Sequence, residues 1–253
     1  MRITLLGCGT SSGVPRLAYG WGACDPLEPR NQRMRSSVLI HHNTKNILID
    51  TTPDFRTQAL IHQIKKIDAV IYTHSHGDHI HGIDDIRSFA NKQKQAIPAY
   101  MDQATWEDLK NRFCYVFEDL SNGAYPPIMK AHIVKPSSIN IASSNVQLFK
   151  QHHGQITSLG IRIGDFAYST DVSQLDDTAF ECLEGIDVWV LDALQLAPHP
   201  THTHLEQSLK WIDRVKPKHA ILTHMNNGMD YQTLKNILPS NVEPGYDGMV
   251  ISL

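Results

Sequence analysis

The sequence predicts an α/β protein of the α+β kind, with two β-sheets that carry helices on their outer faces. Short apolar runs rich in β-branched residues recur along the 253 residues and are typical of strands. Segments with a helical spacing of apolar residues lie between several of these runs. The early runs follow one another as in hairpins, whereas the later runs alternate with helical segments. This order favours two sheets over one doubly wound parallel sheet.

The expected strands are the apolar runs bounded by polar or turn-forming residues. In chain order they are residues 3–6, 37–40, 46–49, 69–72, 146–149, 158–163, 166–169, 188–191, 220–222 and 250–251.

The expected helices show apolar residues three or four positions apart. They are residues 55–67, 83–90, 105–117 and 205–215. The last pattern is the clearest, because Thr203 and Glu206 have the spacing of a capping box at its start. Two segments, 16–35 and 118–145, lack both patterns, and we expect long irregular loops there.

Composition predicts one globular domain over residues 1–253. The chain is 41% hydrophobic and 19% charged, and its formal charge of −3 gives no basis for the positive field on which unspecific nucleic-acid binding depends. No apolar stretch approaches eighteen residues, and the first residues do not resemble a secretion signal. We therefore expect a cytoplasmic protein with no membrane partner, and nucleic acid is not an expected partner.

The four cysteines are scattered along the chain as Cys8, Cys24, Cys114 and Cys182. No two of them form a CxxC pair, so neither a disulfide framework nor a cysteine zinc site is predicted. We expect four reduced thiols.

The segment 73–79 reads Thr-His-Ser-His-Gly-Asp-His and follows an expected strand directly. In extended backbone, side chains two positions apart point to the same side, which places His74 and His76 together. Asp78 and His79 follow after a glycine. Because α/β sheets tend to bind ligands at the carboxyl ends of their strands, we expect these four side chains to form part of a site.

Three later strands also end in potential ligands: Asp171, His224 and the pair His152-His153. A set of nitrogen and oxygen donors without a thiolate suits zinc, manganese or iron. Seven ligands are too many for one tetrahedral ion, so the pattern indicates two divalent ions that share a carboxylate.

In this order the ligands give the HxHxDH signature of the metallo-β-lactamase superfamily, which the sequence resembles. The resemblance implies a four-layer αββα sandwich with a two-metal site at one edge. Further likeness, in segments 7–15, 35–37, 158–160, 199–202 and 245–248, extends over nearly the whole chain. These segments resemble the PhnP-like branch, which contains the phosphoribosyl cyclic phosphate phosphodiesterase of phosphonate breakdown.

The resemblance implies a role for each ligand. One metal would be held by His74, His76 and His153, the other by Asp78, His79 and His224, with Asp171 as the bridge. His153 is preferred over His152 because the family's ligand directly precedes a glycine, here Gly154, but His152 stays open. Cys24 is a single thiol where the phosphonate-pathway enzyme has clustered cysteines, so an additional structural zinc is not expected.

The resemblance implies cleavage of a small phosphodiester, such as a cyclic ribose phosphate or a nucleotide-like compound. Two cations about 3.5–4 Å apart can supply a bridging hydroxide and stabilise an in-line displacement at phosphorus. His202, in the segment matched to the family, is the expected general acid, ahead of His199. Asp78 can also accept a proton, and Asp50 can orient a ligand imidazole.

The glycine-rich turn at residues 7–15 has neither the GxGxxG spacing nor the Walker lysine, so it is not predicted to bind a nucleotide. We expect it to shape the wall of the metal cleft. Ser12, Arg16 and Arg35 are the predicted substrate contacts, and Arg33 is an alternative to either arginine.

Other functions remain open at this stage. A ribonuclease Z-like RNA-processing nuclease shares the HxHxDH motif, although no clear arm for gripping tRNA is visible. Thioester or lactam hydrolysis fits the same ligands. A non-catalytic metal-binding or cofactor-carrier relative is a further alternative, and a homodimer is a further expectation.

Overall fold

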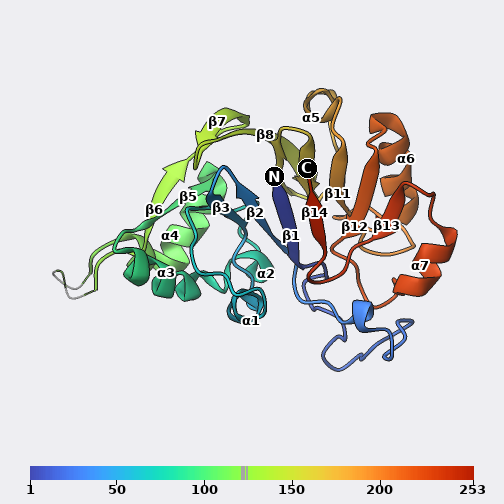
Figure 1. Ribbon diagram of the computed structural model, residues 1–253, viewed down its shortest axis with the longest axis horizontal. Coiled ribbons are helices and arrows are strands. Elements are labelled where there is room, and N and C mark those ends of the chain that lie inside the picture. Colours follow the sequence, from blue (N-terminus) through green and yellow to red (C-terminus); the bar gives the residue numbers. More distant parts are fainter. Residues whose placement is uncertain (121–122, 124) are drawn as a thin grey trace.

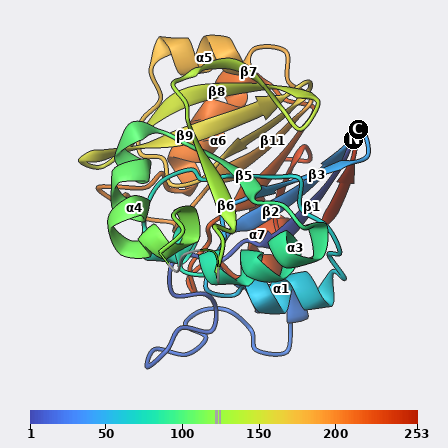
Figure 2. The same ribbon diagram turned by 90° about the vertical axis from the view of Figure 1, so that its left-hand side faces the viewer.

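The computed structural model describes residues 1–120, 123 and 125–253, and it has four layers. Two seven-stranded sheets pack face to face, and helices cover the outer face of each (Figure 1). The predicted αββα fold is therefore confirmed. Figure 2, turned by 90°, shows α1, α3 and α4 on the near side of the first sheet, with α5 and α6 beyond the other.

The first sheet has the order β14-β1-β2-β3-β4-β5-β6. Its strands are β1 Arg2–Gly7, β2 Ser37–His42, β3 Lys45–Ile49, β4 Ala69–Ile71, β5 Ile97–Met101, β6 Met129–Ile133 and β14 Val250–Ser252. Its helices are α1 Phe55–Ile61, α2 Gly77–Ile80, α3 Ile86–Gln93 and α4 Gln103–Phe117, with 3₁₀ turns at Pro29–Asn31 and Ile83–Asp85.

The second sheet has the order β13-β12-β11-β10-β9-β8-β7. Its strands are β7 Ser137–Ile141, β8 Ser144–His153, β9 Ile156–Ile163, β10 Phe166–Ser169, β11 Val188–Asp192, β12 His219–Thr223 and β13 Val242–Pro244. Its helices are α5 Asp177–Leu183, α6 Leu205–Val215 and α7 Tyr231–Ile237.

The direction of the strands explains where the candidate functional residues come together. β3, β4, β5 and β6 run parallel to one another, and so do β10, β11, β12 and β13. Parallel strands need a crossover after each carboxyl end, and those ends lie at the same edge of a sheet. The residues that follow β3, β4, β10 and β12, and the last residue of β11, therefore come together in space.

Three apolar clusters match the three contacts between four layers. The central cluster joins the inner faces of both sheets, with Ile40 and Ile71 from one and Ile161 and Val190 from the other, all fully buried. A second cluster packs α5, α6 and α7 on their sheet, and a third packs α1, α3 and α4 on the other. Burial of this apolar surface is the main force that holds the layers together.

The predicted helix 55–67 is six residues too long. Gln63 adopts a left-handed backbone (φ 49°) just after α1 ends at Ile61, which stops the helix. Ile64 and Ile67 are nevertheless buried against the sheet, so the apolar spacing continued beyond the helix and misled the prediction.

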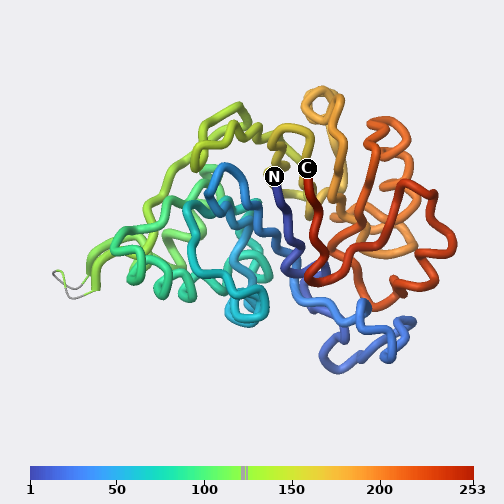
Figure 3. The backbone as a smooth tube through the Cα atoms, viewed as in Figure 1, coloured from blue at the N-terminus to red at the C-terminus, as the bar shows by residue number. Residues whose placement is uncertain are grey.

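The predicted irregular segment 118–145 was wrong in part, because it contains the whole of β6 and β7. Both are edge strands with many exposed side chains, so they lack the apolar pattern of a buried strand. Residues 121, 122 and 124 of this segment lie outside the described residues. Segment 16–35, as expected, is irregular apart from one 3₁₀ turn, and Figure 3 traces it away from the sheets.

The predicted capping box of α6 does not form. His204 is the residue before the helix and makes no side-chain cap. The Thr203 hydroxyl lies 3.2 Å from the Ser208 hydroxyl, and Glu206 pairs with Lys210 at 2.7 Å. Asp176 and Asp230 do cap α5 and α7, two helices that the apolar spacing did not predict.

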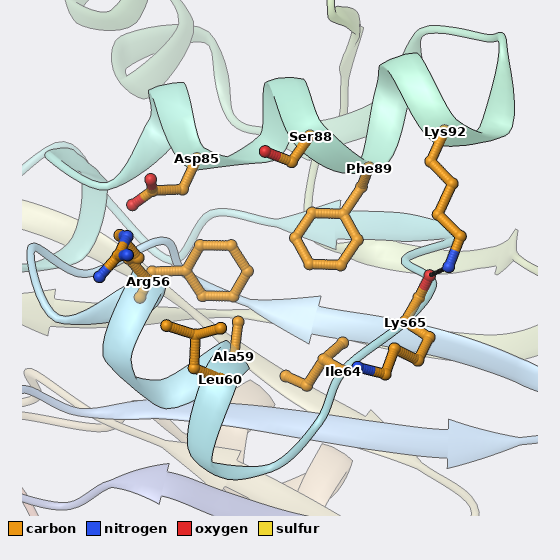
Figure 4. A pocket seen from close by; sticks show the side chains of 10 residues that line it. Arg56, Ala59, Leu60, Ile64, Lys65, Asp85, Ser88, Phe89 and Lys92 are labelled. Atoms are coloured by element: carbon orange, nitrogen blue, oxygen red, sulfur yellow. Dashed lines mark hydrogen bonds between the residues drawn. The ribbon is translucent and has the colours of Figure 1, made fainter.

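An apolar groove of about 300 Å³ lies between α1 and α3 (Figure 4). The rings of Phe55 and Phe89 pack together in it, 5.9 Å apart, and the Lys92 amine donates a hydrogen bond to the Lys65 carbonyl. Residues of the histidine motif do not line it. Within the described residues, no helix is both long enough and apolar enough to cross a bilayer.

Candidate metal centre

The segment after β4 and the ends of strands in the second sheet bring seven histidine and aspartate side chains together. The first group is His74, His76, His153 and Asp171, whose ligand atoms all lie within 4.8 Å of one another. Nε2 of His153 is 3.2 Å from Nδ1 of His76 and 3.6 Å from Oδ2 of Asp171. Nε2 of His74 is also 3.6 Å from Oδ2 of Asp171.

The second group is Asp78, His79, Asp171 and His224, within the same 4.8 Å limit. Nε2 of His79 and Nε2 of His224 lie 3.2 and 3.3 Å from Oδ1 of Asp171. Asp78 approaches the same two imidazoles with Oδ2, at 3.3 and 3.5 Å. The two groups thus have the membership that the resemblance implies.

Asp171 belongs to both groups and turns one oxygen to each. Oδ2 faces His74 and His153, whereas Oδ1 faces His79 and His224. Its side chain is 2% exposed, so the two oxygens are held inside the protein. A carboxylate placed in this way can bridge two cations.

The buried nitrogen atoms of this site fit divalent metal ions. Nε2 of His74, Nε2 of His79 and Nε2 of His224 are buried and have no hydrogen-bond partner among the described residues. Buried polar atoms without partners are rare in proteins, and three of them converge here. Imidazole and carboxylate donors are those that zinc, manganese and iron accept.

In His79 and His153 the ring nitrogen opposite the site, Nδ1, is held by the protein. Nδ1 of His79 donates to Oδ2 of Asp50 at 2.7 Å, and Asp50 also accepts bonds from the Thr73 amide and hydroxyl, both at 2.8 Å. Nδ1 of His153 donates to the Thr201 carbonyl at 2.6 Å. Such bonds fix each ring so that Nε2 points into the site. Asp50 lies where a residue that orients a ligand imidazole was expected.

The electrostatics of the site favour charged carboxylates and a neutral His74. Burial opposes ionisation of Asp171, but the imidazoles of His224, His79 and His74 hold its pKa well below the ordinary value. Burial, helped by the nearby His79, lowers the pKa of His74. Burial would lower the pKa of His79, but Asp171, Asp78 and Asp50 raise it well above the ordinary value, so this ligand would have to lose a proton when a metal binds.

His202 lies beside the second group. Its ring stacks on that of His224, with centroids 4.8 Å apart, and its Nε2 is 3.8 Å from Oδ2 of Asp171. Burial alone would lower the pKa of His202, but Asp192, which accepts a bond from Nδ1 at 2.8 Å, raises it to about 9. His199 is next to this ring at 5.3 Å between centroids.

Sequence reasoning missed Asp192. This residue is fully buried at the end of β11, and its carboxylate also accepts a bond from the Val172 amide at 3.1 Å. The available signal was its position, because β10 and β12 are followed by Asp171 and His224 in the same manner.

His153, not His152, faces the metal centre. The two are consecutive in β8, so their side chains point to opposite faces of the sheet. His152 is in neither group of candidate ligands, and its backbone pairs with Gln174.

The residues predicted to contact the substrate belong to segment 16–35 and to the glycine-rich turn. Arg35 forms an ion pair with Asp54 at 2.9 Å and donates to the Ser11 carbonyl at 3.2 Å. The guanidinium of Arg16 lies 4.9 Å from the Tyr19 ring centroid, in the irregular segment. Ser12 is half-buried in the glycine-rich turn. Contact of these three residues with a substrate stays a prediction.

Two other expectations concern Arg33 and the cysteines. Arg33 is 2% exposed and donates to the Met229 carbonyl at 2.7 Å, so it ties the irregular segment to the second half of the chain. All four cysteines are free thiols. In the described part of the chain, the groups that could hold a metal include none of them.

Comparisons with known proteins agree with this geometry. Residues 45–225 match a family described as the beta-lactamase superfamily domain. A solved structure described as a new diphosphatase from the PhnP family is 36% identical, with a TM-score of 0.92, and the match covers 99% of this chain and 97% of that one.

Two curated proteins are also similar. The chain is 34% identical, over 98% of its length, to an octanoyltransferase of Porphyromonas gingivalis (strain ATCC BAA-308 / W83). It is 24% identical, over 83% of its length, to a ribonuclease Z of Prochlorococcus marinus (strain MIT 9215). The chain spans only 51% and 60% of the lengths of these two relatives.

Proposed function

Because this chain belongs to the β-lactamase superfamily and, within it, to the PhnP-like branch, we propose that it is a two-metal phosphodiesterase that acts on a small substrate. The family and the two groups of histidine and aspartate side chains support a metal-dependent hydrolase. The finer proposal is supported above all by Asp171, whose two oxygens are divided between the two groups.

Seven histidine and aspartate residues of the chain would hold the two ions. His74, His76 and His153 would hold one ion, Asp78, His79 and His224 the other, and Asp171 both. Divalent ions in this place lower the pKa of water and neutralise negative charge on a phosphoryl group. Zinc, manganese and iron all suit the donors.

His202 would protonate the departing oxygen. Asp192 fixes Nδ1 of the ring, so Nε2 is the atom that faces the metal centre. A proton held at Nε2 can pass to the oxygen that leaves phosphorus, which makes a poor leaving group easier to expel. The Asp78 carboxylate lies close to His79 and His224, so its primary role would be that of a metal ligand. It could also accept a proton from the attacking water.

The proposed substrate is a small phosphodiester, such as a cyclic ribose phosphate or a nucleotide-like compound. A net charge of −3 does not favour a long polyanion. The PhnP-family neighbour is described as a diphosphatase, and that activity is therefore a close variant to include in the assay.

The assay begins with protein stripped of metal by a chelator. Restoring Zn²⁺ or Mn²⁺ is expected to restore hydrolysis of bis(p-nitrophenyl) phosphate and of cyclic ribose phosphates, and the variant Asp171→Ala controls for contaminating activity. If the metal-loaded protein leaves every phosphodiester intact, the proposal fails.

A ribonuclease Z-like nuclease is the second candidate, because a named ribonuclease Z is among the relatives. Cleavage of precursor tRNA with tight, salt-dependent binding would place this candidate first. The octanoyltransferase likeness covers half of that protein, so an octanoyl thioester belongs in the same substrate panel. Binding of metal without turnover of any of these compounds would instead support a non-catalytic role.

A further inference from the structure

A polar cleft of about 440 Å³ opens beside His202. One wall is the segment after Asp171, including Ser173 and Gln174, and the other is the segment from Pro198 to the first turn of α6, including His199 and Gln207. Trp211 also lines it and is 8% exposed. We call it the His202 cleft.

The His202 cleft is continuous with the candidate metal centre through one side chain. Nε2 of His202 is 3.8 Å from Oδ2 of Asp171, while the same imidazole lines the cleft. The group that accepts a proton from His202 must lie against this ring. The remaining atoms of this leaving group then lie next to the cleft and can extend into it.

Both walls of the cleft are tied to Asp192, the residue that holds His202. The Asp192 carboxylate accepts bonds from Nδ1 of His202 and from the Val172 amide, next to one wall. The Asp192 carbonyl accepts a bond from the Ser208 hydroxyl at 2.7 Å, which anchors the start of α6 in the other. The Thr203 amide donates to the Val172 carbonyl at 2.6 Å, which joins the two walls directly. The hydrogen bonds of Asp192 therefore position His202 and also hold the two walls of the cleft.

The lining is polar, and the proton-bearing His202 imidazole in it is paired with the Asp192 carboxylate at 2.8 Å. Its described residues include two glutamine amides, hydroxyl groups, imidazoles and an indole, and among them there is no lysine, arginine, aspartate or glutamate. Sites for a second phosphate usually contain arginine or lysine, which pair with phosphate oxygens. Amides and hydroxyls instead match hydrogen-bonding groups that carry no charge.

We propose that the His202 cleft receives the leaving group of the substrate and that Gln207 makes the cleft select a leaving group without charge. This inference rests on the proposed phosphodiesterase function. It distinguishes the chain from an enzyme that expels a phosphate or diphosphate. Gln207 is a specificity-determining residue here, because it lines the cleft from the first turn of α6, a position at which a cationic side chain would attract an anionic group.

The test compares two diesters whose leaving groups differ by one negative charge: methyl 4-nitrophenyl phosphate and its counterpart with a carboxylate on the ring. The measured quantity is the ratio of kcat/KM for the neutral to the carboxylated substrate, so that intrinsic reactivity cancels between variants. Gln207→Lys is expected to lower this ratio at least about tenfold, because at an effective dielectric constant of about 20 an opposite charge has a tenfold effect even from about 12 Å away. Gln207→Glu should raise it.

Gln232→Lys is the matched control, since it adds the same charge on the exposed surface of α7. It should leave the ratio unchanged. A Gln207→Lys protein with the wild-type ratio, or a control that shifts the ratio equally, would overturn the proposal. Wild-type protein that hydrolyses neither substrate would be a failure of the phosphodiesterase function itself, a different result.

A second readout does not depend on turnover. Titration of the metal-loaded protein with D-ribose is expected to shift the indole N–H resonance of Trp211, and Gln207→Lys should weaken this response. An unchanged Trp211 signal at saturating sugar would count against the cleft as the place of an uncharged, hydroxyl-bearing group.

Discussion

The two halves of the candidate metal centre are built by different means. The half from the first sheet lies on one stretch, from His74 to His79, and a buried carboxylate, Asp50, holds one of its rings. The half from the second sheet comes from three separate strand ends. There the backbone is turned into the left-handed region at Asp171 (φ 51°), at His224 (φ 58°) and at Gly154 (φ 61°), directly after His153.

This difference indicates which kind of substitution should damage each half. A left-handed backbone at a residue other than glycine costs about 1–2 kcal/mol, so the folded sheet must stabilise Asp171 and His224 in place. The contiguous half has no such turn at its ligands, although Asp50, which holds His79, has one (φ 61°), and it depends on side-chain hydrogen bonds. Substitutions in the two halves should therefore fail in different ways.

Replacing the shared residue should have the largest effect. Asp171→Ala removes both oxygens that face the two groups, so we expect loss of both metal ions and a fall in kcat/KM of at least about 10³-fold. His76→Ala removes a ligand from the first group alone and should leave the second ion bound. Elemental analysis of both purified variants measures this, and equal metal content in the two would contradict the bridging arrangement.

Removing the proton donor should have the next largest effect, and only for some substrates. His202→Ala is expected to lower kcat by about 10²-fold or more for diesters with alkoxide leaving groups, because they need a proton to depart. For p-nitrophenyl esters, whose leaving group departs without a proton, the loss should be small. A uniform loss over both substrate classes, with bound metal unchanged, would show that His202 does not donate the proton.

The ease of sequence prediction differs between the halves for the same physical reason. The contiguous half could be recognised from 73–79 alone, because alternation along extended backbone places His74 beside His76. The scattered half required the assumption that several strands end at one edge, and the pairing of parallel strands provides that edge.

What the sequence could not provide are partners that meet only in the folded chain. Asp192 is marked in the sequence only by its place at the end of a strand, and its importance comes from His202, ten residues away. Arg35 pairs with Asp54, and no sequence pattern links the two. The strands β6 and β7 were missed because edge strands do not need apolar side chains on both faces.

Weakening the support of the contiguous half should have an intermediate effect. Asp50→Asn keeps the size of the side chain but removes the charge that accepts the bond from Nδ1 of His79. Loss of such a partner costs about 10–100-fold in metal affinity. Competition with a chromophoric chelator measures the affinity, and far-UV circular dichroism controls for folding. Wild-type affinity would mean that Asp50 serves the fold and not the metal.

The smallest expected effect separates backbone from side chain most directly, through one glycine in each half. At Gly154 the backbone is left-handed, and an added Cβ would lie 2.6 Å from Cγ2 of Thr201, whose carbonyl holds His153. At Gly77 an added Cβ would meet only the exposed His81 imidazole, at 2.8 Å, and that side chain can move. Gly154→Ala should therefore lower the free energy of unfolding by about 1–2 kcal/mol, whereas Gly77→Ala should change it by less than about 0.5 kcal/mol. Urea unfolding of the metal-free proteins, compared at equal slope, measures both values. Equal losses in the two variants would mean that the second half does not depend on its backbone turns more than the first, and the contrast between the halves would be wrong.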